Sequence, residues 1–508
     1  MDSELSSSII LFSSLIFLAF LWNVIIRSKR ARNSLINLPP GPRKLPVIGN
    51  LHLLISSRPP HHILADLASK YGPMMHLQLG EISTIVISSP EGAKEVLKTH
   101  DINFANRPSH FATKILTYEH SDIAFSSYGE YWRQLRKVCT IELLSAKRVQ
   151  SFRPLREEVF LNMCNWIVSK EGSSINLSEK ISLATCDIVV RAALGDNNDE
   201  HAEFVSTVKE AFELAGGYYV GDLFPSISLF QAIGGFRGRV KKVHTLSDRI
   251  LQKIINNRKV GSQDEQLENL ADVLLKFRED AGHDLYLSDD NIKAVLQDLF
   301  FAGIETSSAT TDWAMIEMMR HPKVLKKAQD EVRQVFRNKR FVDESDFNEL
   351  KYLKLVIKET LRIHTPGPLL LPRENYEPCE INGYTIPART RVVVNAWAIG
   401  RDPKIWKDAD SFIPERYLDN NISVDYTGNN FDYIPFGAGR RICPAMTFGL
   451  ANVELPLAMF LYHFDWVLPQ GIKPQYWDMA ESFGLTARRK SPLYVIPKLR
   501  NPLPLKYN

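Results

Sequence analysis

One cysteine late in the chain has the neighbours that a metal-binding thiolate needs. Cys443 ends a loop that is interrupted by Gly437 and Gly439, with Arg441 just before it, and an apolar run over 448–460 follows at helical spacing. A thiol near the start of a helix faces unpaired amide groups and the positive end of the helix dipole, and both favour the thiolate. A thiolate beside a guanidinium suits a haem iron with charged propionates. The alternative is a buried free thiol in an ordinary loop.

A carboxylate and a hydroxyl lie side by side in the middle of a long predicted helix. Ser288 supplies a helix start, and apolar periodicity then runs over 292–319 and ends before Pro322. Near the middle of this run, Glu305 and Thr306 follow small residues, and a threonine there can bond back to a carbonyl and loosen the helix. We interpret the segment as a groove for dioxygen and water, with two groups that manage protons. A small-residue packing face is the alternative.

Two further pairs have helical spacing. Glu359 and Arg362 lie on one helix face, where such a pair is usually a weak surface ion pair. Trp132 and Arg136 lie one turn apart, so an indole N–H and a guanidinium can grip the same anion. The alternative for the second pair is a basic, solvated helix face.

The run Phe436-x-x-Gly439-x-Arg441-x-Cys443 resembles the haem-binding signature of the cytochrome P450 family. The resemblance implies haem b (heme b) as the cofactor, with its iron bound by the Cys443 thiolate. It also implies that Phe436, Gly439 and Arg441 contribute to the haem site. The family signature normally has glycine two residues after the cysteine, whereas this chain has Ala445.

The other motifs resemble family elements as well. The resemblance makes Glu305 and Thr306 the acid–alcohol pair that delivers protons to dioxygen. It joins Glu359 and Arg362 to Arg416 in a buried structural network that locks the cysteine loop. The residues that it assigns to the haem propionates are Trp132, Arg136, Arg373 and Arg441.

The segments expected over the open face of the haem are mostly apolar, and their few charges include Arg107, Lys114, Asp298 and Glu305. A hydrophobic, weakly polar substrate follows from this content. The predicted pocket residues are Phe111, Leu299, Ala302, Gly303, Leu369, Leu370 and Leu485.

The chain resembles plant microsomal members of the family that oxidise specialised metabolites. The runs over 303–307 and 448–454 point to the terpenoid- and alkaloid-oxidising branch. We therefore expect a monooxygenase that hydroxylates a terpenoid. An alkaloid or a flavonoid is the alternative substrate, and a non-catalytic haem-binding membrane protein is the alternative of another class.

The N-terminal segment predicts a membrane anchor. Residues 9–26 are almost wholly apolar and are followed at once by a basic cluster, which favours an uncleaved, single-pass helix over a signal peptide. We expect a lumenal segment 1–8, the anchor 9–26, a basic and proline-rich hinge 27–43 and one catalytic domain over 44–508. The resemblance places this domain on the cytosolic side of the endoplasmic reticulum membrane.

Composition supports this assignment. The five cysteines are scattered and odd in number, which argues against a disulfide framework, and a net charge of +4 does not suggest nucleic-acid binding. The pattern is mainly α with small β-sheets, as in the cytochrome P450 fold. A hairpin is expected from 74–79 and 84–88, and a strand over 385–394 with Pro387 at a bend.

Electrons must come from outside the chain because no dinucleotide fingerprint is present. The resemblance implies NADPH–cytochrome P450 reductase as the partner, with NADPH used only through it, and cytochrome b5 as a further candidate. The residues expected to form the basic docking patch are Arg133, Lys137, Lys147, Arg148 and Arg440.

Overall fold

The computed structural model describes Ser14 and residues 37–195, 201–216, 219–227, 235–259, 268–279, 286–337, 339, 341–418, 424–469, 477–482 and 484–504. The predicted lumenal segment, the anchor apart from Ser14, and residues 27–36 of the hinge lie outside these residues. In the part of the chain that is described, no helix is both long and apolar enough to cross a bilayer.

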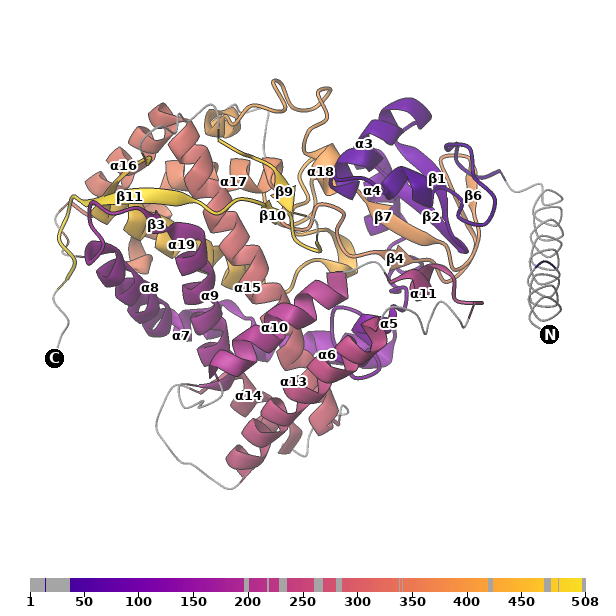
Figure 1. The fold of residues 1–508 in the computed structure, drawn as a ribbon, viewed down its shortest axis with the longest axis horizontal. Coiled ribbons are helices and arrows are strands. Elements are labelled where there is room, and N and C mark those ends of the chain that lie inside the picture. The colour runs from indigo at the N-terminus through magenta and orange to yellow at the C-terminus, as the bar shows by residue number, and fades with distance from the viewer. Residues whose placement is uncertain are drawn as a thin grey trace, which may run out of the picture.

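Helices make up most of the described chain, and the sheets are small (Figure 1). The helices are α2 Leu51–Leu54, α3 Pro60–Tyr71, α4 Pro90–Lys94, α5 Phe111–Leu116, α6 Glu130–Val138, α7 Ala146–Ser151, α8 Arg153–Val168, α9 Leu177–Leu194, α10 His201–Gly216, α11 Val220–Leu223, α13 Phe236–Lys259, α14 Leu270–Glu279, α15 Asp289–Arg320, α16 Pro322–Val335, α17 Lys351–Ile363, α18 Ala396–Ile399 and α19 Met446–His463.

The largest sheet has the order β1-β2-β7-β4 and lies with α3 and α4 at one end of the molecule (Figure 1). Its strands are β1 Met74–Leu79, β2 Ile82–Ile87, β7 Arg391–Val394 and β4 Arg373–Glu374. The other sheets pair β3 Ile175–Asn176 and β8 Phe464–Val467 with β11 Tyr494–Leu499, β5 Cys379–Ile381 with β6 Tyr384–Ile386, and β9 Glu481–Ser482 with β10 Arg488–Arg489. The predicted hairpin is confirmed as β1 and β2.

The strand predicted over 385–394 is wrong in one respect, because two strands of two different sheets occupy it. β6 pairs with β5, whereas β7 runs parallel to β2. Pro387 lacks the N–H that a continuous ladder needs, and Arg389 has φ of +58°. The Asn375 side chain then holds the turn, since it donates to the Pro387 carbonyl at 2.8 Å and accepts from the Thr390 amide at 2.7 Å.

The long helix α15 runs through the helical part of the molecule and packs on α9, α19 and α17 (Figure 1). Its start is confirmed: Ser288 caps the first turn and forms a reciprocal capping box with Asn291. Buried side chains line nearly its whole length, so it forms the centre of the main hydrophobic core. The helix is continuous through Thr306, so this threonine does not interrupt it.

Candidate active site

The loop before α19 places Cys443. The Cys443 amide donates to the Phe436 carbonyl at 3.0 Å, which closes the loop on itself. Gly439 has φ of +69°, and a Cβ there would lie 2.0 Å from the Leu97 carbonyl oxygen, so only glycine fits against this backbone. Asp101 accepts from the Arg440 amide at 2.8 Å, which ties the loop to a segment far earlier in the chain. Gly439 therefore serves packing within the protein.

Cys443 is half-buried, and its ionisation differs from the expectation for a helix start. Burial raises the pKa of the Cys443 thiol, while the Ala445 amide and the charge of Arg136 act in the opposite direction. The arginine that acts on the thiol is Arg136 and not the expected Arg441, and burial outweighs both opposing effects. The thiolate thus needs a cation beside it, as a haem iron would provide.

Ala445 fits the site without strain. Its φ is −96°, outside the left-handed region that favours glycine, so the alanine in place of the family glycine requires no backbone change. Phe436 is half-buried and meets Tyr426 edge-on at 5.5 Å.

Four arginines gather near the cysteine loop from separate segments. Arg373 donates to Asp101 and to the Ala438 carbonyl at 2.9 Å each. Arg441 donates to the carbonyls of residues 105, 123 and 126. Arg136 donates to the Ile442 carbonyl, and Arg107 to the carbonyls of residues 124, 371 and 372.

The positive charge of these guanidinium groups is not fully balanced by nearby negative charge. Burial and repulsion from Arg373 lower the pKa of Arg441 to about 9. Burial, with repulsion from Arg441 and Arg373, holds the pKa of Arg107 well below its usual value, and burial also lowers the pKa of Arg136 and of Arg373. Two carboxylates would supply the missing negative charge, so this donor set fits the propionates of a haem bound by Cys443.

Trp132 lies among these arginines but has a protein partner. Its indole N–H donates to the Ile123 carbonyl at 3.0 Å, and the Arg441 guanidinium lies 4.2 Å from the centre of its ring. Asp298 of α15 accepts from the amides of Ile123 and Ala124 at 2.8 and 3.1 Å. Trp132 and Arg441 are thereby held to α15 through one short backbone segment.

In the sequence, Arg107 and Asp298 stand out only as charges within mostly apolar segments. Arg107 comes immediately before Pro108, and Asp298 falls in a helix of buried apolar residues, but neither position reveals a partner. Only the tertiary structure brings Arg107 to the arginine group and Asp298 to the segment that holds it.

The middle of α15 borders open space. Ala302 is exposed and Thr306 half-buried, whereas most of this helix is buried. The Thr306 hydroxyl donates to the Ala302 carbonyl at 2.5 Å, and Glu305 forms an ion pair with Arg488 of β10 at 3.2 Å. Gly303 allows α9 to approach, since a Cβ there would lie 3.2 Å from a methyl group of Val189.

Glu359, Arg362 and Arg416 meet in a buried network. Arg362 donates to both oxygens of Glu359 at 2.8 and 2.9 Å, and Arg416 donates to one of them at 2.8 Å. The Ile413 amide and the Tyr417 hydroxyl also donate to Glu359 at 2.9 and 3.0 Å. The remaining guanidinium bonds go to the carbonyls of residues 400, 407, 408, 409 and 411.

A series of aromatic rings leads from this network to the cysteine loop. Tyr417 meets Tyr433 with ring centres 6.3 Å apart, Tyr433 meets Tyr426 at 6.0 Å, and Tyr426 meets Phe436 at 5.5 Å. The Tyr433 hydroxyl also donates to the Lys358 carbonyl, next to Glu359. The network is therefore joined by packing to the loop that carries Cys443.

The predicted pocket residues do not all share one surface. Leu299, Leu369, Leu370 and Leu485 are half-buried, and a Cβ at Gly437 would lie 3.8 Å from a methyl group of Leu370. Phe111 instead lines a cavity of about 390 Å³ with residues such as Tyr219, Asp222 and Arg391, and its described lining includes no other predicted pocket residue.

Comparison with known proteins agrees with this geometry. The family model described as "Cytochrome P450" matches residues 39–494. The chain is 53% identical to salviol synthase of Salvia pomifera over 95% of each chain. It is 51% identical to premnaspirodiene oxygenase of Hyoscyamus muticus over 96% of this chain and 97% of the relative. A solved structure of a zebra fish cytochrome P450 with progesterone superposes with a TM-score of 0.76 at 26% identity, covering 86% of this chain and 99% of that one. With a cysteine loop and a set of arginine donors in place, the chain belongs to the cytochrome P450 family and is a cytochrome P450 monooxygenase.

Proposed function

We propose that this enzyme inserts one oxygen atom from dioxygen into a hydrophobic specialised metabolite, and that it hydroxylates a terpenoid. The observation that carries the proposal is the exposed Ala302 one turn before Thr306, in a helix whose side chains are mostly buried. A small, exposed side chain beside a hydroxyl suits a site where a substrate and dioxygen meet. The name of premnaspirodiene oxygenase, at 51% identity, supports a hydrocarbon substrate.

The Cys443 thiolate would bind the haem iron, and Arg107, Arg136, Arg373 and Arg441 would bind its propionates. The haem would supply the activation of dioxygen. The Thr306 hydroxyl, released from the Ala302 carbonyl, would donate a hydrogen bond within the site, and Glu305 would pass protons toward it. The pair with Arg488 would hold the Glu305 carboxylate in position.

We assign the supply of electrons to NADPH–cytochrome P450 reductase on the endoplasmic reticulum membrane, with cytochrome b5 as a further partner and residues 9–26 as the anchor. Lys137, Lys147 and Arg440 are exposed and would contribute to a docking surface, although Arg440 also lies 3.8 Å from Asp101. Arg133 pairs with Glu130, and Arg148 pairs with Glu268 at 2.9 Å, so both contribute less than the sequence suggested.

The test is expression of the chain in membranes together with reductase. The reduced carbon-monoxide difference spectrum should show the red-shifted band of thiolate ligation, and Cys443→Ser should lose it. Incubation with NADPH and a panel of terpene hydrocarbons, alkaloids and flavonoids should give a hydroxylated terpene. Turnover of an alkaloid alone would overturn the substrate assignment.

Thr306→Ala tests the roles within the site. NADPH consumption should continue while product falls several-fold and peroxide appears, since proton delivery typically contributes 10²–10⁴-fold to a rate. Unaltered coupling of NADPH use to product would contradict the role given to Thr306. Thr310→Ala, which removes a hydroxyl that bonds to the Thr306 carbonyl on the same helix, is the matched control.

A further inference from the structure

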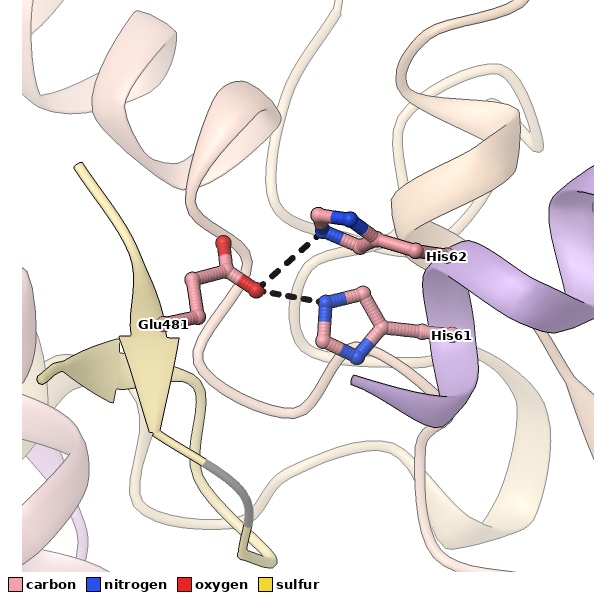
Figure 2. A group of neighbouring side chains, drawn as sticks. All are labelled: His61, His62 and Glu481. Carbon is pink, nitrogen blue, oxygen red and sulfur yellow. Dashed lines mark hydrogen bonds and ion pairs between the residues drawn. The ribbon is translucent and has the colours of Figure 1, made fainter. Parts of the chain in front are cut away.

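Three histidines and one glutamate from distant parts of the chain face one another outside the cysteine site. His61 and His62 lie in the first turn of α3, His364 follows α17, and Glu481 lies in β9. His61 Nε2 is 2.6 Å and His62 Nε2 is 3.4 Å from Glu481 Oε2, and Figure 2 shows both rings directed at this carboxylate. His364 Nδ1 lies 4.0 Å from Glu481 Oε1.

The group is buried, and two of its nitrogens are unsatisfied. The side chains of His61, Glu481 and His364 are only 5–6% exposed, whereas that of His62 is 28% exposed. Among the described residues, His62 Nε2 and His364 Nδ1 are buried atoms without a hydrogen-bond partner. Burial of such an atom without a partner is unfavourable, so the His62 nitrogen, which faces Glu481 together with His61, points to a missing ligand.

The outer contacts hold the group in place. His364 Nε2 bonds to Glu317 Oε1 at 2.7 Å, and its ring stacks on Trp313 at 3.8 Å. His364 Nδ1 in turn faces Glu481 Oε1 at 4.0 Å, so His364 links the two carboxylates. Such outer contacts orient the groups that bind a metal. His62 stacks on Trp397 at 4.2 Å, which fixes its ring too.

We propose that His61, His62 and Glu481 bind one divalent transition-metal ion, with Zn²⁺ the best suited. One nitrogen of each histidine and one oxygen of Glu481 lie within 4.8 Å of one another. Two imidazole nitrogens, one carboxylate oxygen and one water form a four-ligand set that zinc accepts. Zinc–nitrogen bonds of about 2.0–2.1 Å place tetrahedral ligand atoms about 3.3 Å apart. The distance from His62 Nε2 to Glu481 Oε2 is close to this spacing, and that from His61 Nε2 to the same oxygen is shorter by about 0.7 Å.

Bound metal would join two elements that are far apart in sequence. It would connect α3, beside the largest sheet, to β9. β9 leads into the segment that carries Leu485, a predicted pocket residue, so the ion would hold this segment in place. The metal site does not depend on the identity of the substrate.

The experiment uses the full-length haem-loaded protein, purified with its affinity tag removed. The protein is incubated with ZnCl₂, freed of excess metal by gel filtration, and analysed for zinc by mass spectrometry and for haem by absorbance. Wild type should retain about one zinc per haem, as a four-ligand site predicts. His62→Gln should retain at least fivefold less zinc, since it removes the most exposed ligand with little risk to folding. MgCl₂ should not displace the zinc, because Mg²⁺ prefers oxygen ligands.

His100→Gln is the matched control, because His100 is similarly exposed and lies 3.6 Å from a glutamate outside the cluster. Equal zinc in the two variants, or none in wild type, would overturn the proposal. If His62→Gln fails to fold, X-ray absorption of the wild type with zinc decides the matter. Nitrogen and oxygen ligands near 2.0 Å with imidazole scattering support the site, and a sulfur ligand near 2.3 Å refutes it.

Discussion

Two groups of arginines in this protein differ in how their positive charge is balanced. Around Glu359, the charge and hydrogen bonds of the carboxylate exceed the effect of burial and raise the pKa of Arg362. Near the cysteine loop, burial dominates and lowers the pKa of Arg107, Arg136 and Arg441. The first group is complete within the protein, whereas the second has unbalanced positive charge.

Because of this difference, we expect the first group to stabilise the fold and the second to bind an anion. Arg362 and Arg416 have an acid and backbone carbonyls for their donors, so removal of one member should disturb the fold itself. Arg136 has one bond to a carbonyl and a pKa lowered by burial, so it gains most when an anion arrives. The comparison therefore predicts that variants in the first group lose stability and variants in the second lose haem.

The largest effect is expected for Glu359→Gln. Loss of the carboxylate leaves two buried guanidinium groups without a counter-charge, and removal of one partner of a buried pair typically costs about 3–5 kcal/mol. Urea unfolding and haem content report the effect. Glu415→Gln, which breaks only a surface pair with Lys327 and a bond from Tyr352, should cost far less. Equal loss in both variants would refute the structural role of the network.

Arg136→Gln should act on haem more than on folding. A hydrogen bond to a charged group contributes about 1.5–3 kcal/mol, so transfer of haem to apomyoglobin should speed up about 10–100-fold. Arg133→Gln on the same helix, exposed and paired with Glu130, is the control and should transfer haem at the wild-type rate. A wild-type rate for Arg136→Gln would remove this residue from the propionate group.

Glu454 extends the comparison to an acid, because the nearby positive charge offsets only part of the effect of burial on its pKa. Burial raises the pKa of Glu454 to about 7, and the charge of Lys354 offsets this only in part. The folded state therefore holds a proton that the unfolded state releases, so stability is lost as pH rises from about 4.5 to 7. Glu454→Gln stays neutral and should be more stable than wild type by about 2 kcal/mol at pH 8, with no gain at pH 4. Unfolding curves at both pH values check this, and a gain that does not vary with pH would contradict the shift.

The smallest effect is expected for Tyr417→Phe. The hydroxyl is one of several donors to Glu359, so its loss should cost about 1 kcal/mol while haem content stays normal. Thermal unfolding measures this cost. A loss as large as that of Glu359→Gln would mean that Tyr417, and not the arginines, holds the network.

Local patterns in the sequence determined much of this protein. The hairpin, the capped start of α15, the helical spacing of Trp132 with Arg136, and the cysteine motif are readable because each depends on residues close together in the chain. The position of Ala302 and Thr306 on one long helix follows from the same periodicity.

Only the tertiary structure decided the rest. It placed the two parts of the predicted strand in different sheets, raised the pKa of Cys443 through burial, and brought Arg107 and Asp298 to the backbone of Ala124. It also placed Glu481 beside His61 and His364, which no spacing in the sequence suggests. The physical reason is the same in each case: burial, charge balance and partners from distant segments depend on how the chain packs, whereas helices, turns and caps are governed by neighbouring residues.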